Sequence, residues 1–129
     1  MSVVRKSRVL EKMRAGQKAI SYKLNLSCPR AAEIAAMSGF DAVRICQEHV
    51  PTDNSVMEAQ ILAAKAYNCD CIVRVAKGSY SDYIRPLEAD ASGIMIPHLM
   101  SYEEAREIVH TVRFQPLGLR PVDGGYTAK

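Results

Sequence analysis

Four short apolar runs, each followed by a stretch with helical spacing, constrain the fold of this chain more than any other feature. The runs predict strands at 19–26, 40–46, 71–75 and 93–97. Strands that alternate with helices form parallel sheets, because each crossover helix returns the chain to the same edge of the sheet. The run at 71–75 is apolar almost throughout, as expected for a strand that is covered on both faces. The sequence therefore predicts an α/β protein.

The intervening helices are indicated by residues that favour helix ends. Asn54 is the predicted N-cap of one helix, and Ser101 and Glu104 form the S-x-x-E capping box of another. Pro86 falls inside a third helix, where a proline delays the start or kinks the axis. In chain order, helices are predicted at 9–15, 29–37, 54–67, 82–88 and 101–112.

The length of the chain leaves two architectures open. Its 129 residues suit a single domain with four strand-then-helix units. Four units make either a small doubly wound sheet or half of an eight-unit barrel, since a complete barrel usually needs roughly 200 residues or more. Residues 113–129 are rich in Pro and Gly without periodicity, so they are predicted to be a loop or tail.

Composition excludes several classes of function. The formal net charge is +3, and the basic residues are scattered rather than gathered in one stripe, which argues against nucleic acid as a partner. No apolar run approaches the length of a membrane span, and the first residues lack the apolar core of a signal peptide. We therefore expect a cytoplasmic protein with no membrane partner.

The cysteines are predicted to be packed thiols. Four are present, but Cys69 and Cys71 form only a C-x-C pair, and no second pair completes a zinc site. Residues two apart in a strand point to the same face, so both thiols can pack into a core.

Polar side chains able to do chemistry follow the second, third and fourth predicted strands. His49 can transfer a proton near neutral pH, and Arg74 can hold a carboxylate through two parallel N–H groups. His98 follows the fourth strand. The carboxyl ends of parallel strands meet at one rim, where sites are built, so we expect these three side chains on a common rim.

Seven short motifs in order point to one family. They are Ala32-Glu33-Ile34, Ser38-Gly39-Phe40-Asp41, Glu48-His49, Val73-Arg74-Val75, Gly93-Ile94-Met95-Ile96-Pro97, Glu104-Ala105-Arg106 and Pro116-Leu117-Gly118-Leu119-Arg120. Together they resemble the HpcH/HpaI family of metal-dependent pyruvate aldolases, over about residues 9–125. The match covers the front half of a family member. The resemblance implies a partial (β/α)8 TIM barrel with about four βα units, formed by residues 1–129 as a single domain.

The resemblance also implies an activity and a set of site residues. The activity is reversible aldol cleavage of a hydroxylated 2-oxo acid to pyruvate and an aldehyde, by an aldehyde-lyase that is expected to be a homo-oligomer. His49 takes the place of the family's acid/base group and Arg74 that of the residue that binds the pyruvate carboxylate or enolate oxygen. Glu88 stands at the acid of the L-D-x-G segment, which pairs with the histidine. The family's divalent metal (Mg²⁺, Mn²⁺ or Co²⁺) is held by a Glu and an Asp that are expected to fall after Lys129, so no metal ligand is expected within this chain.

Departures from the family pattern keep alternatives open. Cys46 stands where the family usually has the Asp of D-x-E-H, and Val50 and Asp90 replace glycines. A non-catalytic remnant or assembly subunit of the same fold is therefore the alternative. A doubly wound ligand-binding domain is disfavoured, because no Gly-rich phosphate loop follows any strand. Glu48 is either a partner of a metal-bound water or a solvated loop acid. His110 is expected at the surface, and Arg120 is expected in a solvated tail, with a place at the mouth of the site as its alternative.

Overall fold

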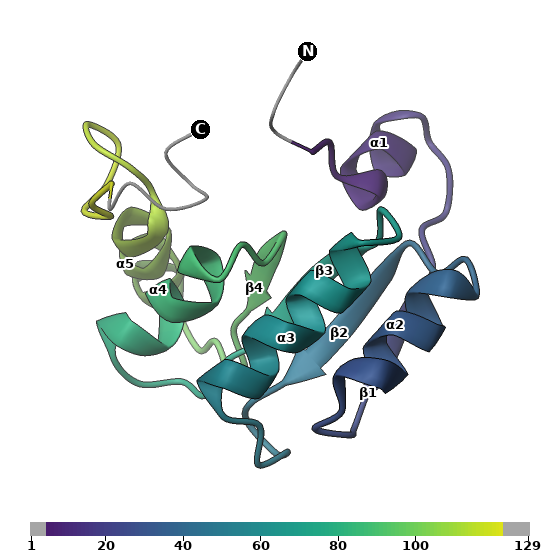
Figure 1. Ribbon diagram of the computed structural model, residues 1–129. Coiled ribbons are helices and arrows are strands. Elements are labelled where there is room, and N and C mark those ends of the chain that lie inside the picture. Colours follow the sequence, from purple (N-terminus) through teal and green to yellow (C-terminus); the bar gives the residue numbers. More distant parts are fainter. Residues whose placement is uncertain (1–4, 123–129) are drawn as a thin grey trace.

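A single parallel sheet organises the part of the chain that the computed structural model describes, residues 5–122. Its four strands lie in chain order, so each strand pairs with the one that precedes it (Figure 1). The register aligns Leu24 with Ile45 and Ile45 with Val73. The strands are β1 (Ser21–Leu24), β2 (Ala42–Cys46), β3 (Asp70–Arg74) and β4 (Gly93–Met95).

Helices cover one face of this sheet. Figure 1 shows α2 and α3 side by side in front of β1, β2 and β3, with α4 and α5 continuing the layer beyond β4. Val43, Ile45 and Val73 point to this layer and are almost completely buried in a common core with Met57 and Ile61. The helices are α1 (Arg8–Arg14), α2 (Pro29–Met37), α3 (Asn54–Lys65), α4 (Tyr80–Glu88) and α5 (Tyr102–Val112).

Two helix starts differ from the sequence prediction. The N-cap of α3 is Asp53 rather than Asn54, because the Asp53 carboxylate accepts the N–H of Val56 at 2.9 Å. Helix α4 begins at Tyr80, two residues before the predicted start at Asp82. There Asp82 accepts the backbone N–H of Ser79 at 2.7 Å as half of a capping box, so it lies in the first turn.

Helix α1 lies at the amino edge of the sheet and is held there by Asp70. This carboxylate is 1% exposed, and it accepts the Ser7 hydroxyl at 2.5 Å and the Val9 N–H at 2.9 Å and pairs with Arg5. Burial raises the pKa of Asp70, but these hydrogen bonds outweigh burial and leave it below its ordinary value. The carboxylate therefore stays charged at neutral pH.

Asp41 makes an equivalent connection from the position directly before β2. Its carboxylate pairs with Lys12 at 2.8 Å and with Arg8 at 3.0 Å, and it accepts the N–H of Ile20 at 2.9 Å. The hydrogen bond from Lys12 is the main cause that lowers the pKa of Asp41. Two buried carboxylates at the starts of neighbouring strands thus fasten α1 across this edge.

The segment after α5 corrects the expectation for Arg120. Its side chain is buried, 6% exposed, with the guanidinium 4.5 Å from the centre of the Phe114 ring and Nε 2.9 Å from Glu88 Oε1. Phe114 and Arg120 also form an isolated parallel bridge. The expectation of a solvated Arg120 is therefore wrong, because the segment folds back on itself. The remainder of the predicted tail, 123–129, lies outside the described residues.

Across residues 5–122, none of the helices is long and apolar enough to cross a membrane.

Candidate functional site

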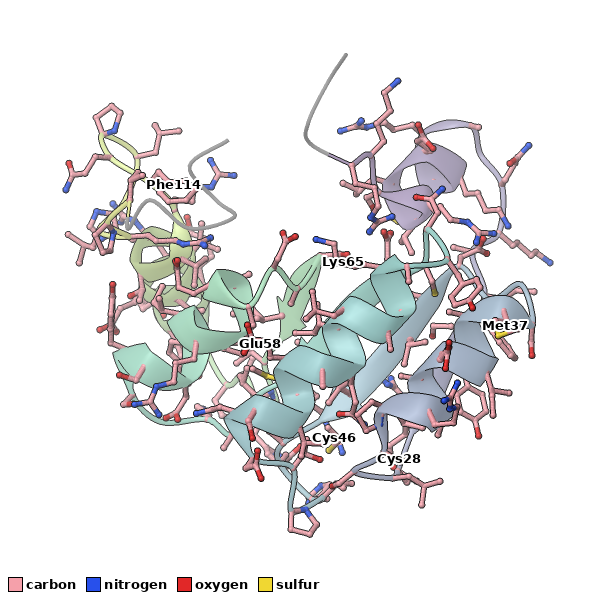
Figure 2. The ribbon with its side chains drawn as sticks, viewed as in Figure 1. Cys28, Met37, Cys46, Glu58, Lys65 and Phe114 are labelled. Carbon is pink, nitrogen blue, oxygen red and sulfur yellow. The ribbon has the colours of Figure 1, made fainter. Side chains whose placement is uncertain are left out.

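The chain segments that leave β2 and β3 run side by side at the carboxyl edge of the sheet. The two strands are paired through Cys46 and Arg74, and the N–H of Gln47 donates to the carbonyl of Arg74 at 2.8 Å. Figure 2 shows Cys46 at the lower edge of the sheet and Lys65 at the upper, amino edge. Residues 46–49 are therefore placed at the rim where β3 also ends.

One carboxylate brings the predicted rim residues together. Glu48 Oε1 lies 3.0 Å from His98 Nε2 and 3.5 Å from His49 Nε2, and Glu48 Oε2 lies 3.0 Å from Arg74 Nε. We call these four side chains the Glu48 cluster. The predicted common rim for the two histidines and the arginine is confirmed. Sequence reasoning left the role of Glu48 open, and its adjacency to His49 in the E-H motif was the available signal.

The members of the Glu48 cluster differ in exposure. The Glu48 side chain is 13% exposed and that of Arg74 21%, whereas the His49 and His98 side chains are 63% and 76% exposed. The acid and the guanidinium thus form the floor of the cluster, and the two imidazoles reach solvent above it. Exposed imidazoles beside a shielded carboxylate are placed to exchange protons with a bound molecule.

Cys46 contacts the buried side of the Glu48 cluster, at Arg74. Its sulfur, on a side chain that is 1% exposed, accepts hydrogen bonds from Arg74 Nη2 at 3.0 Å, Arg74 Nε at 3.4 Å and the backbone N–H of His49 at 3.3 Å. Burial raises the pKa of the Cys46 thiol, but the bonds from Arg74, His49 and Glu48 outweigh it, so the pKa lies below its ordinary value. The same bond raises the pKa of Arg74, which keeps the guanidinium charged.

One oxygen of Glu48 is paired with a cation but accepts no hydrogen bond from any residue between 5 and 122. Arg74 Nε is near Glu48 Oε2, but its N–H donates to the Cys46 sulfur. Glu48 Oε2 is also buried, and it accepts no hydrogen bond from any residue between 5 and 122. A buried carboxylate oxygen without a donor is costly unless a bound water or ligand supplies one.

His98 owes its position to a strained backbone and a lysine. Its φ is +49°, in the left-handed region, directly after the buried Pro97. Lys77 Nζ donates to the His98 carbonyl at 2.7 Å, and Lys77 is itself paired with Glu104 at the start of α5. This chain of contacts ties the loop after β4 to the loop after β3.

Glu88, the third site residue predicted from the sequence, lies elsewhere. It ends α4 and pairs with Arg120, which packs on Phe114. Figure 2 shows Phe114 on the side of the amino edge, far from Cys46. Asp90, two residues beyond Glu88, pairs with Lys65 at that same edge. Within one chain, the structure therefore places Glu88 at the opposite edge from the Glu48 cluster.

The cysteines other than Cys46 pack as predicted, with one exception. Cys69 and Cys71 are completely buried, and burial raises the pKa of both thiols. Cys28, at the start of α2, is only half-buried. All four thiols are free.

The described residues do not form a metal site by themselves. No group of three or more His, Cys, Asp or Glu side chains in the described range is arranged to hold a metal ion. The Glu48 cluster contains a single carboxylate, whereas Mg²⁺ and Mn²⁺ favour several oxygen ligands.

Comparisons with known proteins show which family the chain belongs to. The model of the family described as HpcH/HpaI aldolase/citrate lyase matches residues 22–126. A hydroxypyruvate/pyruvate aldolase of Pseudomonas aeruginosa is 30% identical over 116 residues, which are 90% of this chain and 43% of the relative. A 2-keto-3-deoxy-L-rhamnonate aldolase of Salmonella gallinarum is 33% identical over 112 residues, 87% of this chain and 42% of the relative.

Solved structures give the same result. The HpcH/HpaI aldolase from Desulfitobacterium hafniense DCB-2 superposes with a TM-score of 0.86 at 29% identity, over 93% of this chain and 47% of that chain. Citrate synthase SbnG superposes with a TM-score of 0.83 at 32% identity, over 88% and 46%. The chain thus spans less than half the length of these relatives. The predicted fold class, an α/β chain with about four units of an aldolase-type barrel, is confirmed, and the chain belongs to the HpcH/HpaI aldolase/citrate lyase family.

Proposed function

We propose that this chain supplies the proton-transfer and carboxylate-binding half of a pyruvate aldolase. The reaction is reversible cleavage of a hydroxylated 2-oxo acid to pyruvate and an aldehyde. One observation above all supports this: His49, His98 and Arg74 meet around Glu48 at the carboxyl edge, in a chain whose relatives are named as aldolases. That edge is where barrel enzymes carry out their chemistry.

Arg74 has the role of binding the substrate's anionic end. Aldol cleavage leaves an enolate of pyruvate, and a fixed cation beside its oxygens stabilises the charge that develops. Cys46 and Glu48 hold the guanidinium from two sides, so little reorganisation is needed when the substrate arrives. Arg is suited to this role because its planar fork matches a carboxylate.

His49 has the role of proton carrier. Its Nε2 is 3.5 Å from Glu48 Oε1, which orients the ring, and most of its side chain faces solvent, where substrate enters. The ring would accept the proton of the substrate hydroxyl in cleavage and return it in synthesis. Glu88 remains a proposed catalytic acid, and it would require a His49 from another copy, because Arg120 and α4 hold it at the opposite edge. The role of Glu88 therefore depends on a second proposal, that the protein is a homo-oligomer of single-domain subunits.

The proposal includes a divalent metal, which the complete enzyme would bind rather than this chain alone. Mg²⁺, Mn²⁺ or Co²⁺ would offset the charge on the enolate oxygen. Because the described residues supply no coordination set, each step above is assigned to side chains of this chain alone. A small 2-oxo acid as partner and a cytoplasmic location complete the proposal.

The test uses the chain completed by the second half of the Pseudomonas aeruginosa relative. We expect this protein to exchange the methyl protons of pyruvate with solvent deuterium and to release pyruvate from a hydroxylated 2-oxo acid. His49→Gln should slow the exchange by roughly 100-fold or more while metal affinity stays the same. Arg74→Gln should weaken pyruvate binding, measured by calorimetry.

His110→Gln provides the matched control, because His110 lies exposed on α5, outside the Glu48 cluster. It should leave the exchange rate unchanged. If the completed protein exchanges no pyruvate protons, or if His49→Gln is as active as His110→Gln, the proposal fails and the non-catalytic alternative replaces it. The 129-residue chain alone is expected to bind Mn²⁺ weakly and to cleave no substrate.

A further inference from the structure

The inner face of the sheet is unusually basic. Val43 and Ile45 point toward the helices and are buried in the core with Leu24. Because side chains alternate along a strand, Arg44 and Lys23 point to the opposite face, together with Arg74. In a (β/α)8 barrel this face lines the interior, which is normally filled by bulky apolar side chains. Cations on it therefore need an explanation.

These three cations occupy neighbouring positions on one face of the sheet, and we call them the inner cations. Lys23 and Arg44 are register partners on β1 and β2, and Arg44 is paired with Ile72, two residues before Arg74 on β3. Neighbouring strands lie about 4.8 Å apart and two residues rise about 6.6 Å, so backbone positions 44 and 74 are roughly 8 Å apart. Long basic side chains from both positions can reach the two ends of one small molecule.

Two of the inner cations, Arg44 and Lys23, have no partner within residues 5–122. Arg74 is held by Glu48 and Cys46, but neither Arg44 nor Lys23 makes a hydrogen bond or ion pair with a described residue. Arg44 is nevertheless half-buried. A partly desolvated guanidinium without an acceptor is unfavourable, and an anion that enters the interior would supply the missing acceptor. At the amino edge, by contrast, each buried charge is neutralised within the chain.

We infer that Arg44 and Lys23 bind a second anionic group of the substrate, a carboxylate or a phosphate, while Arg74 binds the 2-oxo acid end. This inference rests on the proposed function for the identity of the first group. It adds the substrate class, a 2-oxo acid or aldehyde partner that has an anion at its far end. The site differs from the Glu48 cluster because Arg44 lies two residues before the end of β2, and therefore further from the carboxyl edge than the cluster.

The test compares three ligands by calorimetry at low ionic strength. They are 2-oxobutyrate, with one charge, 2-oxoglutarate, with a second carboxylate, and 3-phosphonopyruvate, with a phosphonate. We expect both doubly charged acids to bind the protein at least about tenfold more tightly than 2-oxobutyrate. The tighter of the two identifies the group that the inner cations favour. The advantage should shrink as salt is added.

Arg44→Gln should abolish this advantage without changing the affinity for 2-oxobutyrate, and Arg44→Lys should restore part of it. Lys23→Gln is a second variant at an exposed position that the fold tolerates, and it should reduce the advantage in the same direction. Lys18→Gln, in the exposed segment before β1, is the control and should change nothing.

The inference is overturned if the doubly charged acids bind no better than 2-oxobutyrate, or if Arg44→Gln keeps their advantage. If they bind through Arg44 while 2-oxobutyrate does not bind at all, the anion site stands and the proposed aldolase function fails. If none of the three acids binds, both fail.

Discussion

Cys46 places a thiol whose ionised form is favoured by the fold beside the Glu48 cluster. The Cys46 sulfur lies against Arg74, which also pairs with Glu48, and the hydrogen bonds from Arg74 and its neighbours outweigh burial and hold the pKa of the Cys46 thiol below its ordinary value. The family pattern has an aspartate at this position, which is charged throughout. Cysteine at this position therefore replaces a side chain of constant charge with a thiol whose charge depends on pH.

We predict that Cys46→Ser costs more stability as the pH rises. The folded pKa of Cys46 lies below the ordinary value of 9.0, so its ionised form is favoured in the folded state. The resulting stabilisation is present above the unfolded pKa and is lost as pH falls through the folded pKa. Urea unfolding at pH 6, 7.5 and 9 should show a difference from wild type that grows to roughly 1 kcal/mol.

Cys69→Ser is the matched control. Burial raises the pKa of Cys69, so its thiol stays neutral in the folded state over this range and its contribution should not grow toward pH 9. Equal pH profiles for the two variants would contradict the lowered pKa of Cys46.

Strand ends made part of the site predictable. His49 and Arg74 could be placed on one rim because short apolar runs precede them and parallel strands end at the same edge. Their common partner was not predictable, since Glu48 contacts His98 across fifty positions of sequence. Arg120 was predicted wrongly for a similar reason: its partner Glu88 is thirty-two positions away, and no local pattern encodes that contact.

At the scale of elements, the helices and strands themselves were predicted correctly, but some helix ends were not. All nine predicted helices and strands occur within residues 5–122. The ends depend on which of two adjacent polar residues caps the helix. Asp53 and Asn54 are both suitable N-caps, and extended backbone at Asp53 decides between them. The docking of α1 on Asp41 and Asp70 could not be predicted at all, because it is a tertiary contact.

We predict that Asp70→Asn loosens α1 without unfolding the sheet. The amide keeps the size of the side chain but loses the charge that Arg5, Ser7 and Val9 stabilise, at a cost of about 1.5–3 kcal/mol. Hydrogen exchange should become faster at the amides of α1 while those of β2 and β3 stay protected.

The same docking should weaken in acid. The pKa of Asp70 is below its ordinary value of 3.8, so its stabilisation is present above that pH and is lost as pH falls through the folded pKa. Glu58→Gln, at an exposed position on α3, should leave the exchange of α1 unchanged. Protection of α1 that is unaffected by Asp70→Asn would show that Asp41 holds the helix alone.

At the scale of the whole molecule, the sheet has two outer strands. Within residues 5–122, β1 pairs only with β2 and β4 only with β3, so each leaves one row of backbone groups without a strand partner. Several large apolar side chains near these strands are also exposed, among them Ile20, Tyr22 and Leu99. Open edges and apolar surface together favour association.

We predict that the 129-residue chain self-associates in a concentration-dependent way, measured by sedimentation velocity. Tyr22→Lys, on β1, should shift the equilibrium toward monomer because a charged edge strand resists pairing. Tyr67→Lys is the control, since Tyr67 has nearly the same exposure, 42% against 43%, and lies beyond the end of α3. A sharp monomer peak at high concentration for the unmodified chain would contradict this prediction.

The strand order β1-β2-β3-β4 has a consequence for how the chain is made. Each strand pairs with its immediate predecessor, so no strand has to wait for a partner that is synthesised much later. Contacts between neighbours in sequence form quickly because the loops that must close are short. A ribosome-bound chain can therefore assemble its sheet one strand at a time, in the order of translation, and each of these strands that emerges after β1 adds to a surface that is already folded.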